Sequence, residues 1–102
     1  MASGTIKTLG HEQTITTSTG WSTNTTSCFT IGQFAFVQFY VQGTPSNGKA
    51  IATGLPTPKT APIYTAAGSS PSVIAINSNG ALAISSAGTG TYIGGAFVYE
   101  TA

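Results

Sequence analysis

Few side chains in this sequence can move a proton or hold a metal ion. Asp and Arg are absent, and charged residues make up 5% of the 102 positions, where a typical domain carries about a quarter. Glu12 and Glu100 are the only two carboxylate side chains, and glycoside hydrolysis needs such a pair on either side of the scissile bond. No pattern brings them together, so we expect both to solvate strand ends.

The single cysteine, Cys28, and the single histidine, His11, are formally available as a nucleophile and its base. Cys28 lies within the apolar strand pattern SCFTI, and no Asp exists to orient the imidazole, so we expect Cys28 to be a small buried hydrophobic residue. One cysteine also excludes an intrachain disulfide and the usual zinc sites. The sequence predicts no catalytic residue, no metal and no cofactor, and we expect a protein that is not an enzyme.

Several binding functions are disfavoured as well. Three lysines do not form the basic stripe that nucleic acid requires, and the AGTG segment lacks the lysine and helix of a phosphate loop. The first residues do not follow the pattern of a signal peptide, and no apolar run is long enough for a membrane helix. The sequon at Asn24 is therefore taken as accidental. We expect neither nucleic acid nor membrane insertion.

A neutral ligand remains compatible with this composition. Saccharides are held by hydrogen bonds to their hydroxyls and by stacking on an aromatic ring, which needs no charge. Trp21, in the polar run STGWSTNTT, is the first candidate, either as a contact residue or as a core plug. Asn77 and Asn79 lie in a turn, where such residues often serve backbone geometry. The full set of candidate saccharide-binding residues is Trp21, Asn24, His11, Tyr64, Asn77 and Asn79.

The elements that must position these residues are β-strands, since no window shows helical periodicity. We expect a single domain, residues 1–102, built as a small antiparallel β-sandwich or barrel. The expected strands are Thr5–Leu9, Gln13–Thr17, Ser27–Ile31, Gln33–Gln42, Lys49–Ala52, Ile63–Thr65, Ser72–Asn77, Ala81–Ser85 and Thr91–Tyr99.

Alternation within the strand Gln33–Gln42 predicts two unequal faces. One is wholly apolar and should face the core, namely Ala35, Val37, Phe39 and Val41. The other is half apolar, namely Phe34, Phe36, Gln38 and Tyr40. A solvated sheet face should not be half apolar, so this strand is either central in the sandwich or meets another subunit. The expected strand at Thr91–Tyr99 likewise has apolar residues on both faces. Its Gly94-Gly95 pair predicts a bulge or a close backbone approach.

Turn chemistry separates the strands. The Asn-Gly at positions 79–80 predicts a hairpin, and Thr44–Gly48 predicts a second one. Two prolines in Leu55–Pro58 exclude a central strand there, so we expect an extended connection that crosses from one sheet to the other.

Three segments together, IATGLPTP, INSNGALAISSAG and the closing TYIGGAFVYE, carry a family resemblance over roughly residues 20–100. In them the chain resembles the head domains of bacteriophage tail-fibre and receptor-binding proteins, those of lactococcal and other Gram-positive phages above all. The resemblance implies a jelly-roll-like head that forms a homotrimer at the tail tip of the virion and is made in the cytoplasm of the bacterial host. Residues 1–10 are then a candidate remnant of a shaft or linker.

The resemblance also implies adhesion to a host cell-wall polysaccharide without catalysis, next to other tail or baseplate proteins. Heads of this family surround their saccharide with Trp, His, Asp and Arg, whereas this chain has neither Asp nor Arg. No contact residue is therefore carried over, and a neutral glycan is favoured. The alternative is a structural decoration or assembly domain of the tail or baseplate that has no ligand of its own.

Overall fold

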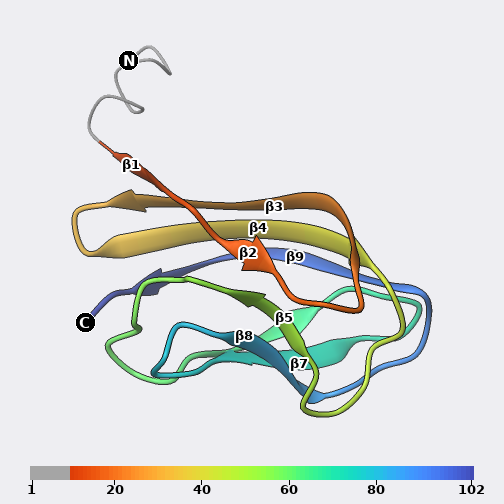
Figure 1. Cartoon of the computed structure of the whole chain (residues 1–102). Coiled ribbons are helices and arrows are strands. Elements are labelled where there is room, and N and C mark those ends of the chain that lie inside the picture. Colours follow the sequence, from red (N-terminus) through yellow and green to blue (C-terminus); the bar gives the residue numbers. More distant parts are fainter. Residues whose placement is uncertain (1–9) are drawn as a thin grey trace.

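Two antiparallel sheets form the computed structural model, which describes residues 10–102 apart from the side chains of Thr23 and Asn24 (Figure 1). The expected strand at Thr5–Leu9 lies outside the described residues. Within them, nine strands and no helix are found, which confirms the predicted all-β class. The strands are β1 (His11–Gln13), β2 (Thr16–Thr17), β3 (Ser22–Ile31), β4 (Phe34–Gln42), β5 (Ala50–Thr53), β6 (Ile63–Ala66), β7 (Ser72–Ile76), β8 (Leu82–Ser86) and β9 (Tyr92–Glu100).

The first sheet has the order β1-β3-β4-β9 and the second the order β2-β5-β8-β7-β6. Strand β4 lies inside the first sheet, because antiparallel β3 pairs with one edge, with a register shift between Thr23 and Thr25, and antiparallel β9 pairs with the other in continuous register. The predicted hairpin at Asn77–Gly80 joins β7 to β8, and Gly80 adopts the positive φ of +81° that such a turn needs.

The core lies between the two sheets and follows the alternation of β4. Ala35, Val37, Phe39 and Val41 are all buried, as predicted, while the residues between them are exposed. The second sheet contributes a set of isoleucine and leucine side chains, namely Ile51, Ile74, Ile76, Leu82 and Ile84. Burial of each of these large aliphatic side chains contributes about 1.5–3 kcal/mol.

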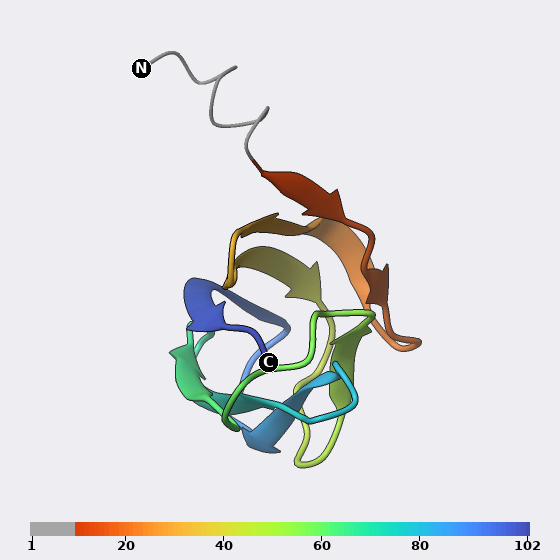
Figure 2. The ribbon, with the colours of Figure 1, turned by 90° about the vertical axis from the view of Figure 1, so that its left-hand side faces the viewer.

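The two sheets are also connected along their lateral edges, so that the strands surround the core when viewed end-on (Figure 2). On one side the chain passes directly from β1 in the first sheet to β2 in the second. On the other side, Gly94 of β9 exchanges backbone hydrogen bonds of 2.8 and 3.0 Å with Ala67, just after β6. The Gly94-Gly95 pair therefore makes the predicted close approach rather than a bulge.

Three local predictions are wrong in detail. Gln13–Thr17 is not one strand, because the chain changes sheets between Gln13 and Thr16. Thr44–Gly48 is not a hairpin turn, since it links β4 and β5, which belong to different sheets. Leu55–Pro58 does not cross between sheets, because β5 and β6 lie in the same one. It runs across the end of the sandwich instead, where Pro58 bridges to Thr101.

Candidate functional site

Trp21 is fixed in place by contacts with two separate segments and with the core. It directly precedes β3, and its indole Nε1–H donates a 2.7 Å hydrogen bond to the backbone oxygen of Ala50 at the start of β5. Gly43, just beyond β4, lies so close to the ring that an added Cβ would be 2.7 Å from Trp21 Cε3. The side chain is half-buried and packs against the core, so the ring is both an anchor and a partly open surface.

Lys49 is positioned over the same ring. Its Nζ lies 4.1 Å from the centre of the indole, within the range of a cation–π interaction, and it also donates a 3.0 Å hydrogen bond to the backbone oxygen of Thr44. The ammonium therefore interacts with the ring and with a backbone carbonyl dipole and stabilises the loop before β5 against the loop before β3.

A solvent-open depression of about 620 Å³ lies beside the exposed part of the indole. We call it the Trp21 depression, and it is lined by Gly20, Trp21, Ser22, Gln42, Gly43, Thr44 and Thr91. Every lining side chain is uncharged, and hydroxyl and amide groups surround the single aromatic ring. Such a surface can exchange hydrogen bonds with a neutral polyol and contact its apolar face, and it offers no group that titrates near neutral pH.

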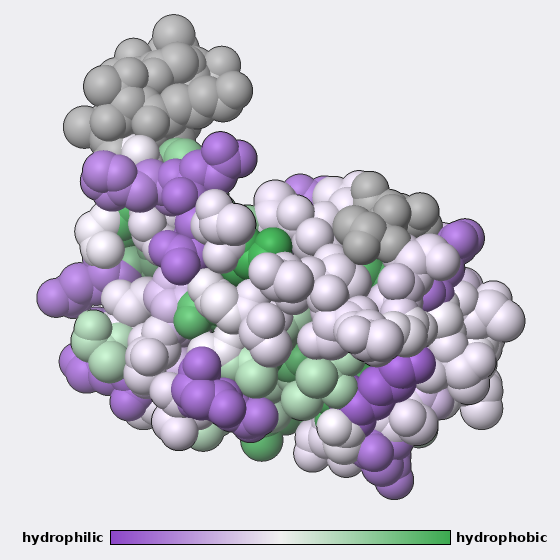
Figure 3. All heavy atoms as spheres, viewed as in Figure 1, coloured by the Kyte–Doolittle hydropathy of each residue, from purple (hydrophilic) through white to green (hydrophobic). Residues whose placement is uncertain are grey.

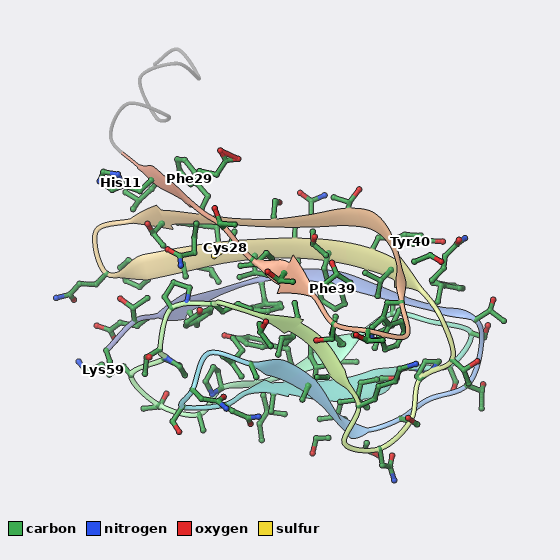
Figure 4. All side chains as sticks on the ribbon, in the orientation of Figure 1. His11, Cys28, Phe29, Phe39, Tyr40 and Lys59 are labelled. Carbon is green, nitrogen blue, oxygen red and sulfur yellow. The ribbon has the colours of Figure 1, made fainter. Side chains whose placement is uncertain are left out.

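His11 does not reach this depression. It is exposed on β1, where it pairs with Thr30, and Thr30 in turn pairs with Ala35 of β4. The Trp21 depression is at the other end of β4, at Gln42, about 23 Å away at the usual rise of a strand. Figure 4 shows the same separation, with His11 at one end of the first sheet and Tyr40 towards the other.

The two asparagines are also remote from Trp21. Both are exposed in the turn between β7 and β8, and the Oδ1 of Asn79 accepts a 3.2 Å hydrogen bond from the backbone nitrogen of Ala81. The backbone oxygen of Asn77 accepts a 2.9 Å hydrogen bond from the backbone nitrogen of Gly80, which closes the turn. The side chain of Asn24 lies outside the described residues.

Tyr64 connects the two sheets. Its ring stacks on Phe97 of β9 with a centroid distance of 4.5 Å, and its hydroxyl donates a 2.8 Å hydrogen bond to the backbone oxygen of Val98. Burial raises the pKa of this phenol above its usual range. The structure therefore does not bring the predicted saccharide-binding residues that it describes into one site, and of the five whose side chains are described only Trp21 lines the depression.

Sequence reasoning missed most of the depression, namely Gln42, Thr44 and Thr91. These residues stand at the ends of β4 and β9, and pairing of those strands brings them to Trp21. No motif in the sequence marks them. Gly20, next to Trp21 in the sequence, was the one available signal, because glycine permits close approach of a backbone to a ring.

The groups considered for catalysis lie apart. Glu12 on β1 and Glu100 on β9 are separated by three strand spacings, about 14 Å, whereas the carboxylates of glycosidases stand roughly 5–9.5 Å apart. Glu100 instead lies 3.6 Å from Lys59 Nζ in an exposed ion pair. Cys28 is 1% exposed, which confirms its predicted burial, and burial raises the pKa of its thiol.

Comparisons with protein-family models, with curated proteins and with solved structures find no match to this chain. Residues 10–102 include no helix of the length and apolarity that would cross a membrane. The space-filling view in Figure 3 shows one face, largely of intermediate hydropathy with scattered hydrophobic and hydrophilic residues.

Proposed function

We propose that this chain is a non-enzymatic adhesion module that holds a neutral saccharide in the Trp21 depression. The observation that carries the proposal is the composition of that depression, in which hydroxyls, an amide and two glycines surround the only tryptophan and no charged side chain lines the surface. A neutral glycan offers matching hydroxyls and an apolar ring face, so each component of the site has a counterpart.

The biological setting follows from the sequence resemblance. We propose the head of a phage receptor-binding protein at the tail tip, acting as a homotrimer on a host cell-wall polysaccharide. An open depression with few anchoring groups binds one sugar weakly. In a head with three copies, the first site that binds a repeating polymer holds the other two sites near it. The later binding events are then intramolecular, so the avidity exceeds the affinity of any single site.

The experiment uses the single tryptophan as its own reporter. We would titrate the protein with purified cell-wall polysaccharides from Gram-positive bacteria and follow the emission of Trp21. Thr44→Tyr fills the depression with a bulky side chain and is expected to weaken binding at least about tenfold, or 1.4 kcal/mol. Thr57→Tyr is the matched control, because Thr57 is likewise exposed and precedes a proline but lies at the other end of the sandwich.

Two results would contradict the proposal. One is a Thr44→Tyr protein that binds as tightly as the unmodified chain. The other is the lack of any emission change or pull-down with every polysaccharide tested, which would favour the structural role in a tail or baseplate. That second function is supported by one observation, the exposed large hydrophobic side chains on the outer face of the first sheet, namely Phe34, Phe36, Tyr40 and Val98.

A further inference from the structure

Two loops contribute walls to the Trp21 depression, and both lie outside the strands. Gly20 and Trp21 precede β3, and Thr44 follows the end of β4 by two residues. The residue after Thr44 is Pro45, which has no backbone N–H to donate to a neighbouring strand. The position of these walls therefore depends on contacts other than the pairing of β3 with β4.

One ammonium group joins the two walls. The Nζ of Lys49 donates a 3.0 Å hydrogen bond to the backbone oxygen of Thr44 and a longer one, of 3.4 Å, to the backbone oxygen of Gly20. The same Nζ lies 4.1 Å from the centre of the Trp21 ring. Because an ammonium carries three N–H donors and a positive charge, it can hold two carbonyl oxygens and an aromatic ring at once. Its removal would release both walls together.

The base of the Lys49 side chain is anchored to the second sheet. The backbone oxygen of Lys49 accepts a 2.9 Å hydrogen bond from the backbone nitrogen of Ile84 in β8, and its backbone nitrogen donates a 3.1 Å hydrogen bond to Ser46. Gly20 leaves room for the far end of the chain, because an added Cβ on Gly20 would lie 3.3 Å from Lys49 Cε. The side chain therefore connects β8 to both walls of the depression.

Lys49 is not one of the residues that line the depression, although its three contacts are all with residues that do. Hydrogen bonds from a charged donor and a cation–π contact together change a local equilibrium by more than about tenfold. A lysine placed in this way fixes the walls while its charge is directed at the protein itself rather than at the open space.

We infer that Lys49 is the positioning residue of the Trp21 depression, which pre-forms the two walls and so sets the affinity of the site without contact with the ligand. The effect on affinity rests on the proposed function, whereas the effect on the walls exists in the free protein. When a site must first form, its apparent dissociation constant rises in inverse proportion to the fraction of molecules in which it is formed. Walls that are in place about a tenth of the time would weaken binding about tenfold.

The first test is amide hydrogen exchange in the free protein, measured by mass spectrometry. Lys49→Met keeps a long side chain but removes the cation and its donors, so exchange in segments 19–22 and 43–49 should become about tenfold faster. Lys49→Arg keeps a cation that can stack on the ring and donate to carbonyls, and it should restore slow exchange. Lys59→Met is the matched control, because the Lys59 side chain is 62% exposed in its ion pair with Glu100 and should leave both segments unchanged.

The second test is titration of the same variants with the purified Gram-positive cell-wall polysaccharides. Lys49→Met should bind about tenfold more weakly, or by 1.4 kcal/mol, whereas Lys49→Arg and Lys59→Met should bind like the unmodified chain. Every titration is made at a temperature at which circular dichroism shows the variant to be folded, so that loss of stability does not enter the affinity.

Unchanged exchange in both segments of a folded Lys49→Met protein would overturn the inference, and so would binding by that protein as tight as that of the unmodified chain. Binding that weakens with added salt in the unmodified chain but not in Lys49→Met would overturn it as well, because the ammonium would then contact an anionic ligand directly. If the unmodified chain binds no polysaccharide, the proposed function fails, while exchange in the free protein still decides whether Lys49 pre-forms the walls.

Discussion

Replacement of Trp21 by alanine should destabilise the whole fold, and the structure allows the cost to be worked out. Loss of the 2.7 Å hydrogen bond to Ala50 costs about 1 kcal/mol. The half-buried ring removes roughly 100 Å² from water, which is about 2.5 kcal/mol at 25 cal/mol per Å². Loss of the contact with Lys49 adds about 0.5–1 kcal/mol. The sum is about 4 kcal/mol.

A loss of this size is a large fraction of the stability of a small domain. At the usual 4–8 °C per kcal/mol, the melting temperature should fall by about 16 °C or more. Differential scanning calorimetry measures the change directly. A fall of less than about 4 °C would refute the reasoning, because it would show that Trp21 is not an anchor of the fold.

Two milder variants separate the contributions. Trp21→Phe keeps an aromatic ring but removes the N–H donor, and Lys49→Met removes the cation above the ring together with its hydrogen bond to the backbone oxygen of Thr44. Because phenylalanine still offers a ring to the cation, their double-mutant cycle should give a coupling free energy below the about 0.5–1 kcal/mol of the full contact. A Trp21→Ala protein would lose saccharide binding through unfolding alone, so Thr44 rather than Trp21 is the residue whose replacement tests binding.

Two further predictions concern the fold. Gly80 and Gly48 both adopt φ +81°, but a Cβ on Gly80 would overlap the backbone oxygen of Leu55, whereas nothing lies near Gly48. Gly48→Ala should therefore lower the free energy of unfolding by only about 1–2 kcal/mol, and Gly80→Ala should lower it clearly more in the same urea titration. Equal losses in the two variants would contradict the close approach of Gly80 to Leu55. Burial raises the pKa of Tyr99, so the unfolded chain loses this proton first and stability should fall above about pH 10, by up to about 1.4 kcal/mol per pH unit. Tyr99→Phe should lessen that fall between pH 10 and 11, and an identical pH dependence would count against the assignment.

The strands were predictable because burial on one side imposes a period of two on the sequence. The alternation in β4 identified the core residues Val37 and Phe39 and also the unusual outer positions Phe34 and Phe36. The connections were less predictable. The proline-containing turn at Thr44–Gly48 resembles a hairpin locally, and only the pairing of whole strands decides whether a turn joins neighbours or different sheets.

Of the candidate site, only the central residue, Trp21, was predictable from the sequence. An aromatic ring in a polar run pointed to Trp21, but the interaction with Lys49 and the contribution of Thr91 depend on contacts between distant segments. Tyr64 illustrates the opposite error of single-residue reasoning. A tyrosine can serve as a ligand contact or as a buried donor, and its position beside Phe97 gives this one a structural role in joining the sheets.

The sandwich has a definite polarity. Gly10 lies against Phe29, Thr101 donates a hydrogen bond to the backbone oxygen of Gln33, and both contacts are at the hairpin between β3 and β4. Figure 1 shows the described chain entering and leaving at this same end. A carrier, bead or fusion partner held at this end of the described chain would therefore leave the opposite end, with the Trp21 depression, facing outward.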